Sequence, residues 1–139
     1  MRKSVLILCT GNSCRSQMAE GIARNLFGDK YDVFSAGTQP SIVHPLAISV
    51  MKEIGIDISS HRSKSVTKFL GKEFDFILTV CGNVDQACPS FPGKATRVHW
   101  GFGDPAYAEG DMAQLLEIFR MVRDAIYIKF EKEWENTFR

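Results

Sequence analysis

The sequence predicts an α/β fold: one three-layer αβα domain spanning residues 1–139, with a small parallel sheet of about four strands. Three observations support this prediction. The length of 139 residues suits one domain. A composition of 45% hydrophobic and 24% charged residues is that of a globular protein. Short apolar runs also alternate with stretches of helical period, which indicates βαβ units with right-handed crossovers and a sheet covered on both faces.

The first half of the chain contains two predicted strands and two predicted helices. A continuous apolar run indicates a buried strand at Ser4–Cys9, and apolar residues at a spacing of four predict a helix at Gln17–Phe27. A second, shorter strand is expected at Asp32–Ala36. The next helix is expected to begin near Pro45, which suits a first helical turn, and to end at Gly55.

The second half contains two more strands and a long final helix. Phe74–Val80 has the pattern of a central strand, and Arg97–Trp100 is a shorter candidate. The helix is expected from Met112 to near the end of the chain. Its apolar residues are spaced by three or four, which predicts a face packed in the core. They are Leu115, Phe119, Val122, Ile126, Phe130, Trp134 and Phe138.

Charge and hydropathy narrow the choice of partners and compartment. A net charge of +1 and a pI near 7.7 argue against a nucleic acid as the main partner, because no net positive field attracts a polyanion. The apolar stretch Val5–Cys9 is shorter than the roughly 7–15 residues of a signal peptide core. No run approaches the roughly 18–20 apolar residues of a membrane span. We therefore expect a cytoplasmic protein that binds neither nucleic acid nor a membrane.

The loop between the first strand and the first helix carries the strongest functional signal. From Cys9 to Ser16 it has the form Cys, five residues, Arg, Ser. Gly11 and Asn12 tolerate the positive φ that such a short loop needs. We expect the backbone N–H groups to point inward at the positive end of the helix and to form a nest for an oxyanion. The expected oxyanion-binding residues are Thr10, Gly11, Asn12, Ser13, Cys14 and Arg15.

Three side chains of this loop suit nucleophilic chemistry on a tetrahedral oxyanion. Arg15 offers a planar fork of donors that fits such an anion. The helix terminus and Arg15 both favour the thiolate form of Cys9, which makes this thiol the candidate nucleophile. The hydroxyl of Ser16 can stabilise the same sulfur. We therefore expect the nucleophile and the anion clamp to share one loop.

The cysteines form two close pairs, Cys9 with Cys14 and Cys81 with Cys88. In a reducing compartment such residues are thiols unless they are catalytic, redox-active or metal-bound. Cys9 and Cys81 both stand at the carboxyl end of a predicted strand, so they can meet at one edge of the sheet. A zinc site built from the four cysteines is an alternative, although their spacing is wider than usual for zinc. No pair of histidines has the spacing of metal ligands either. A second alternative is a non-catalytic protein that binds an anion.

The segment from Cys9 to Gly21 resembles the active site shared by low-molecular-weight protein tyrosine phosphatases and thioredoxin-coupled arsenate reductases. The resemblance covers nearly the whole chain and is closer to the reductases. It continues through Ser35-Ala36-Gly37, Met51–Ser59, Cys81 with Cys88-Pro89, His99–Pro105 and Arg120–Asp124. Asp104-Pro105 corresponds to the acid–proline pair of this superfamily, so the resemblance implies that Asp104 is the general acid that protonates the leaving oxygen.

The resemblance implies a redox relay. Cys9 attacks arsenate, Cys81 then attacks the adduct, and Cys88 receives the oxidising equivalent as a Cys81–Cys88 disulfide that thioredoxin reduces. A phosphatase with a Cys9 phosphoenzyme is the alternative, but it has no use for the second cysteine pair. That pair therefore favours the reductase, with weak phosphatase activity as a side reaction. Cys14 is expected to pack as a small apolar residue.

One position departs from the family pattern. Some of these reductases hold a potassium ion with an asparagine, a glutamate, a serine and an aspartate. Asn12, Glu20 and Ser35 match the first three, but Lys64 stands where the aspartate is expected. Our hypothesis is that the Lys64 ammonium replaces the cation and pairs with Glu20; an ordinary solvated lysine is the alternative. We expect no tightly bound cofactor or metal. We expect the chain to be a monomer that binds arsenate or phosphate and contacts thioredoxin transiently.

Overall fold

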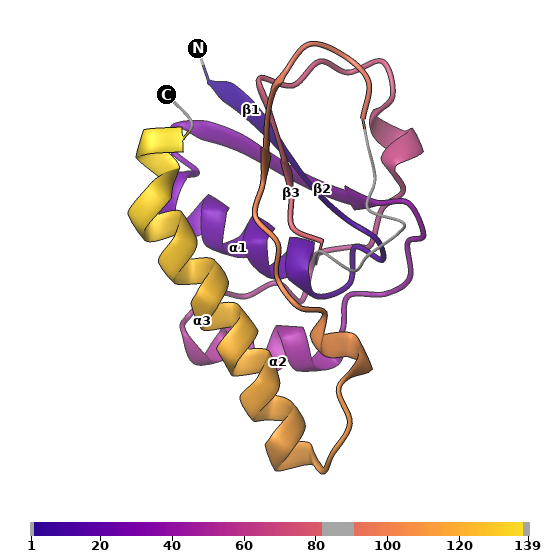
Figure 1. Cartoon of the computed structure of the whole chain (residues 1–139), viewed down its shortest axis with the longest axis vertical. Helices are drawn as coiled ribbons and strands as arrows, with labels where there is room; N and C mark the ends of the chain where they lie inside the picture. Colours follow the sequence, from indigo (N-terminus) through magenta and orange to yellow (C-terminus); the bar gives the residue numbers. More distant parts are fainter. Residues whose placement is uncertain (1, 82–90, 138–139) are drawn as a thin grey trace.

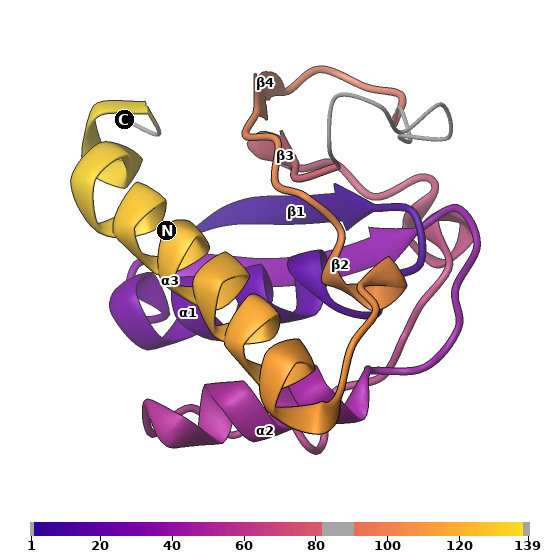
Figure 2. The same cartoon turned by 60° about the horizontal axis from the view of Figure 1, so that its bottom comes forward.

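The computed structural model describes residues 2–81 and 91–137. Its sheet is parallel throughout and has the strand order β2-β1-β3-β4. The strands β1, β2 and β3 are labelled in Figure 1, and β4 is labelled in Figure 2. The strands are β1 (Lys3–Cys9), β2 (Tyr31–Gly37), β3 (Phe76–Thr79) and β4 (Thr96–His99). The α/β prediction with four parallel strands is confirmed.

The central strand β1 has a continuous apolar sequence because both of its faces are buried. Its residues from Val5 to Cys9 are all buried. Successive side chains point to opposite faces, so Val5 and Ile7 join the core on one face, and Leu6 and Leu8 join the core on the other. A strand covered on both faces cannot alternate apolar with polar residues without burying the polar ones.

Three helices lie together on one face of the sheet (Figure 2). They are α1 (Arg15–Phe27), α2 (Pro45–Glu53) and α3 (Met112–Thr137). The expected core face of α3 is buried at Phe119, Ile126, Phe130 and Trp134, whereas Phe138 lies outside the described residues. Within residues 2–81 and 91–137, no helix has the length and apolarity to cross a membrane.

The opposite face is covered by a short 3₁₀ helix and the segments beside it. This helix, η1 (Val66–Phe69), joins a small aromatic cluster with Phe34, Phe74 and Phe91, whose ring centroids lie 5.7–5.9 Å apart in edge-on pairs. The sheet is thus covered on both faces, and in the described residues the cover on this face consists of η1 and extended segments.

The strand order places the candidate chemistry at one edge. The chain moves from β1 outward to β2 and then crosses back to β3, so the direction of winding reverses at β1. Ligands of parallel sheets bind at such a point, beyond the carboxyl ends of the strands. β1 ends at Cys9. The N–H of Val80 donates to Leu8 O at 2.9 Å, which places the adjacent Cys81 at the same edge.

Candidate active site

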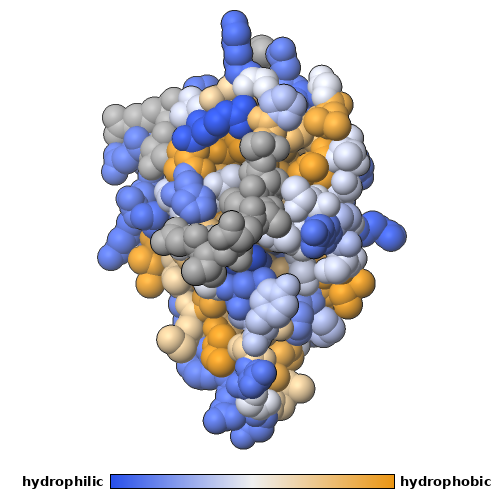
Figure 3. All heavy atoms as spheres, turned by 45° about the vertical axis from the view of Figure 1, so that its right-hand side comes forward, coloured by the Kyte–Doolittle hydropathy of each residue, from blue (hydrophilic) through white to orange (hydrophobic). Residues whose placement is uncertain are grey.

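A pocket of about 280 Å³ opens at the carboxyl end of β1. It brings together Cys9, Arg15 and Asp104, three residues singled out from the sequence. The remaining lining residues are Thr10, Gly11, Ser13, Cys14, Gln39, Ser41, Ala106 and Tyr107. Figure 3 turns this side of the molecule forward, where hydrophilic side chains alternate with small hydrophobic areas.

Cys9 lies at the base of the loop and contacts a hydroxyl. Its side chain is buried, and its Sγ is 2.9 Å from Ser16 Oγ. The helix α1 begins at Arg15, two residues earlier than predicted, with Cys14 at the N-cap position. The Cys14 side chain makes no capping hydrogen bond. The positive end of the α1 dipole therefore faces the pocket that Cys9 lines.

The loop reverses direction at one residue. Asn12 has a φ of 47°, as predicted for the left-handed region. Gly11, the other residue of the loop that tolerates a positive φ, does not adopt one. The carbonyls of Thr10, Gly11 and Ser13 accept hydrogen bonds from the backbone N–H groups of residues 39, 41 and 44 at 2.9–3.2 Å. These bonds hold the loop carbonyl groups in place.

Gly37 permits this loop to lie against the end of β2, a role that the sequence did not reveal. A Cβ atom on Gly37 would lie 2.4 Å from Thr10 O, 2.9 Å from Cys9 O and 2.9 Å from Asn12 N. Only a residue without a side chain fits this approach between two backbone segments. The signal in the sequence was a glycine at the end of a strand, which indicates a strand end as well as a close contact.

The side chain of Asn12 connects the loop to its supports. It is fully buried, and its Nδ2 donates to Ser16 Oγ at 2.8 Å and to Ser35 Oγ at 2.9 Å. Its Oδ1 accepts from the Lys64 backbone N–H at 2.8 Å and from Gln17 Nε2 at 3.0 Å. The left-handed conformation of Asn12 is thus fixed by a network in which both ends of its amide are bound.

Glu20 lies behind this network as a buried carboxylate with three basic side chains around it. It is 3% exposed, and Ser35 Oγ donates to its Oε1 at 2.5 Å. Arg24, His61 and Lys64 approach the same carboxylate at 3.3, 3.5 and 3.8 Å. Burial lowers the pKa of Lys64, and the charge of Glu20 opposes that shift.

His61 belongs to the same network. Its Nδ1 is 3.0 Å from Gln17 Oε1, and Gln17 Nε2 donates to Asn12 O at 3.1 Å. This chain of contacts links the helix α1 and the segment around residue 62 to the loop. The sequence pattern did not reveal the roles of Gln17 and His61, because neither has a distinctive spacing.

Arg15 and Asp104 form an ion pair inside the pocket. Arg15 is 2% exposed, and its Nη2 is 3.1 Å from Asp104 Oδ2, while its Nη1 donates to Phe102 O at 3.2 Å. Asp104 Oδ1 also accepts the N–H of Ala106 at 3.0 Å and so caps the short helix η2 (Pro105–Tyr107). The Asp–Pro sequence therefore places a carboxylate at the side of the pocket opposite the loop.

Comparison with known proteins agrees with this geometry. The family model of the low molecular weight phosphotyrosine protein phosphatases matches residues 4–135. The chain belongs to this family. An arsenate reductase of Halalkalibacterium halodurans is 49% identical over 125 residues, which are 90% of each chain. An arsenate reductase of Bacillus subtilis is 44% identical over 135 residues, covering 97% of this chain and 96% of the relative.

Solved structures of arsenate reductases have the same fold. An arsenate reductase in its oxidised state has a TM-score of 0.79 and 34% identity, covering 98% of this chain and 96% of the other. A thioredoxin-dependent arsenate reductase of Corynebacterium glutamicum has a TM-score of 0.66 and 28% identity. That match covers 97% of this chain and 63% of the other.

The other cysteines of this family member differ in their surroundings. Cys81 is fully buried and is not among the residues that line the pocket. Burial raises the pKa of Cys14 to about 12, so this thiol stays protonated, and its side chain packs in the same core cluster as Cys9. Cys9, Cys14 and Cys81 form no disulfide with one another. Cys88 lies outside the described residues.

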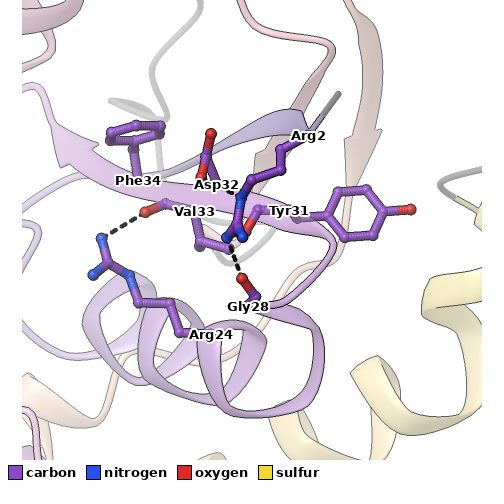
Figure 4. A pocket seen from close by; sticks show the side chains of 7 residues that line it. All are labelled: Arg2, Arg24, Gly28, Tyr31, Asp32, Val33 and Phe34. Atoms are coloured by element: carbon purple, nitrogen blue, oxygen red, sulfur yellow. Dashed lines mark hydrogen bonds and ion pairs between the residues drawn. The ribbon is translucent and has the colours of Figure 1, made fainter.

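A larger cavity, of about 480 Å³, is lined by Arg2 before β1, by the end of α1 and the residue after it, and by β2 (Figure 4). It shares no lining residue with the pocket beside Cys9. Its two arginines are already bonded to protein: Arg2 donates to Gly28 O, and Arg24 donates to Val33 O at 2.6 Å. We interpret both as supports for the end of α1 and the edge of β2. In the described part of the chain, no three His, Cys, Asp or Glu side chains gather as metal ligands do.

Proposed function

We propose that this chain reduces arsenate to arsenite, with Cys9 as the nucleophile, Cys81 and Cys88 as the relay, and thioredoxin as the electron donor. The observation that carries the proposal is the pocket in which Cys9, Arg15 and Asp104 converge at the positive end of α1. Curated relatives that are 40–49% identical are arsenate reductases, and the Corynebacterium glutamicum neighbour is described as thioredoxin-dependent.

The first step is substitution at arsenic. The loop amides and Arg15 hold the oxyanion, and the Cys9 thiolate attacks the arsenic atom. A sulfur–arsenic bond forms and an arsenic–oxygen bond breaks. As a carboxylate, Asp104 first accepts a proton from a hydroxyl of the bound oxyanion, and it then passes that proton to the departing oxygen, because expelling hydroxide without a proton is slow. Ser16 Oγ, 2.9 Å from Cys9 Sγ, stabilises the thiolate before the attack and again when it is released.

The second step transfers two electrons to arsenic. The Cys81 thiolate attacks Cys9 Sγ, and the electron pair of the sulfur–arsenic bond remains on arsenic, which leaves as arsenite. The resulting Cys9–Cys81 disulfide is opened by Cys88, which releases Cys9 and forms a Cys81–Cys88 disulfide. Because Cys81 is fully buried, its attack on Cys9 requires the Cys81 side chain to become accessible from the pocket. Thioredoxin then reduces the second disulfide, and such a thiol cycle suits the cytoplasm.

The loop keeps its shape through Asn12, Ser35, Glu20 and Lys64. These residues do not offer a set of oxygen ligands for a potassium ion. Asn12 Oδ1 already accepts two hydrogen bonds, and the Lys64 ammonium lies 3.8 Å from the Glu20 carboxylate. A second cation beside that ammonium would be repelled. We therefore expect potassium chloride and choline chloride at equal ionic strength to give the same turnover and the same Tm. A marked rise with potassium would contradict this role of Lys64.

Two activities measured on one variant distinguish reductase from phosphatase. The wild type and Cys81→Ser are assayed with arsenate plus thioredoxin, and separately with p-nitrophenyl phosphate. We expect Cys81→Ser to lose arsenate turnover and to keep weak phosphatase activity, because only reduction needs the second thiol. Retained phosphatase activity also shows that the variant is folded. Full arsenate turnover in Cys81→Ser would refute the relay and make phosphoester hydrolysis the leading function.

A further inference from the structure

We propose that Asp104 makes the pocket selective for oxyanions that carry a proton, so that arsenate and phosphate bind in preference to sulfate. The inference rests on the proposed function only in that the pocket holds a tetrahedral oxyanion. It assigns to Asp104 a role in substrate recognition in addition to its role as general acid.

The geometry leaves Asp104 with unused acceptor capacity on the pocket side. Its Oδ1 accepts the N–H of Ala106, and its Oδ2 accepts Arg15 Nη2 at 3.1 Å. Each oxygen of a carboxylate has two acceptor positions. Asp104 lines the pocket, and its side chain is 21% exposed. An oxyanion held by Arg15 therefore meets this carboxylate as its neighbour on the same guanidinium.

The charges around the pocket determine which oxyanions can bind beside the Asp104 carboxylate. The titratable groups that face Asp104 are Arg15, Cys9, Cys14 and His44. Cys14 is a neutral thiol because burial raises its pKa to about 12, and the charge of Asp104 adds to that rise. Burial lowers the pKa of His44, so its ring is neutral at neutral pH, although Asp104 opposes the shift. Arg15 is therefore the cation among these four.

An oxyanion without a proton is penalised next to Asp104. Sulfate at neutral pH presents only acceptor oxygens, so an oxygen facing Asp104 Oδ2 meets like charge and no hydrogen bond. Arsenate and phosphate keep at least one proton at neutral pH, and their hydroxyl can donate to the carboxylate in a charge-assisted hydrogen bond. Sites that depend on a ligand hydroxyl reject analogues that lack it, because a polar group of the protein is then left unpaired. A hydrogen bond to a charged group corresponds to roughly 10- to 100-fold in affinity.

Two variants isolate this effect. In Asp104→Asn the amide can still cap η2, and it can either donate to an oxyanion or accept from it. Glu109→Gln is the matched control, because it removes one negative charge from the same exposed segment without altering a residue that lines the pocket. Each protein is titrated calorimetrically at neutral pH with inorganic phosphate and, separately, with sulfate.

We expect the wild type and Glu109→Gln to bind phosphate at least about tenfold more tightly than sulfate. For Asp104→Asn we expect the two affinities to converge to within about threefold, through a gain in sulfate affinity. Equal affinities in the wild type would overturn the inference, and so would an unchanged preference in Asp104→Asn. If equal affinities accompany normal arsenate turnover, only the selectivity fails. If neither anion binds, the oxyanion pocket and the proposed function fail together.

Discussion

Replacing Gly37 by alanine tests whether the close approach of β2 holds the loop from Cys9 to Ser16. The added Cβ would lie 2.4 Å from Thr10 O, whereas ordinary contacts of this kind begin at about 3.4 Å. The loop or the strand must therefore move by about 1 Å, and neither atom involved belongs to a flexible side chain. Overpacking of this kind costs about 1–3 kcal/mol. A displacement of about 1 Å at a catalytic group can lower kcat/KM by about 100-fold.

The matched control for this experiment is Gly103→Ala. Gly103 precedes Asp104 on the opposite side of the pocket, and a Cβ there meets no atom within 4 Å. Urea unfolding, phosphate titration and arsenate turnover are measured for both variants. We expect Gly37→Ala to lose stability, phosphate affinity and turnover, while Gly103→Ala resembles the wild type in all three. Wild-type phosphate affinity and turnover in Gly37→Ala would refute the argument that this contact fixes the loop.

Three further predictions concern charges beneath and beyond the loop. Glu20→Gln should lower the free energy of unfolding by about 3 kcal/mol in urea titrations, because it leaves the mostly buried Lys64 ammonium without its carboxylate partner. Lys64→Met should cost about 1 kcal/mol or less, because Arg24 still faces Glu20. Burial lowers the pKa of His44 and His61 below the ordinary 6.5, so the unfolded chain binds more protons than the folded chain. The free energy of unfolding should therefore fall as the pH drops below about 6.5. The double variant His44→Asn, His61→Gln should flatten this part of a Tm–pH profile. Hydrogen bonds from Arg120 and Arg123 of α3 lower the pKa of Glu53 to about 2. The contribution of Glu53 to stability is therefore present above pH 4.5 and is lost as the pH falls toward 2. Glu53→Gln should accordingly lower the Tm at neutral pH and leave it unchanged near pH 2.

The features that the sequence predicted well are those encoded in short stretches of chain. The buried run that forms β1, the apolar stripe of α3 and the loop from Cys9 to Ser16 each depend on neighbouring residues, so periodicity and residue type were sufficient. Element ends were less certain: β3 spans Phe76–Thr79, whereas the apolar run had predicted Phe74–Val80. Strand ends depend on where the neighbouring strands pair, which the apolar pattern of one segment does not specify.

From the sequence alone we predict a chemical repertoire for this protein: a thiol nucleophile, an arginine clamp and a carboxylate acid on an α/β scaffold. The tertiary structure decided how these groups are held. The pairing of Arg15 with Asp104, the passage of the loop over Gly37 and the link from His61 through Gln17 to Asn12 all join residues that are distant in sequence. The full burial of Cys81 outside the pocket was likewise visible only in the fold. Such contacts depend on the relative placement of whole elements, and no local pattern of side chains records that placement.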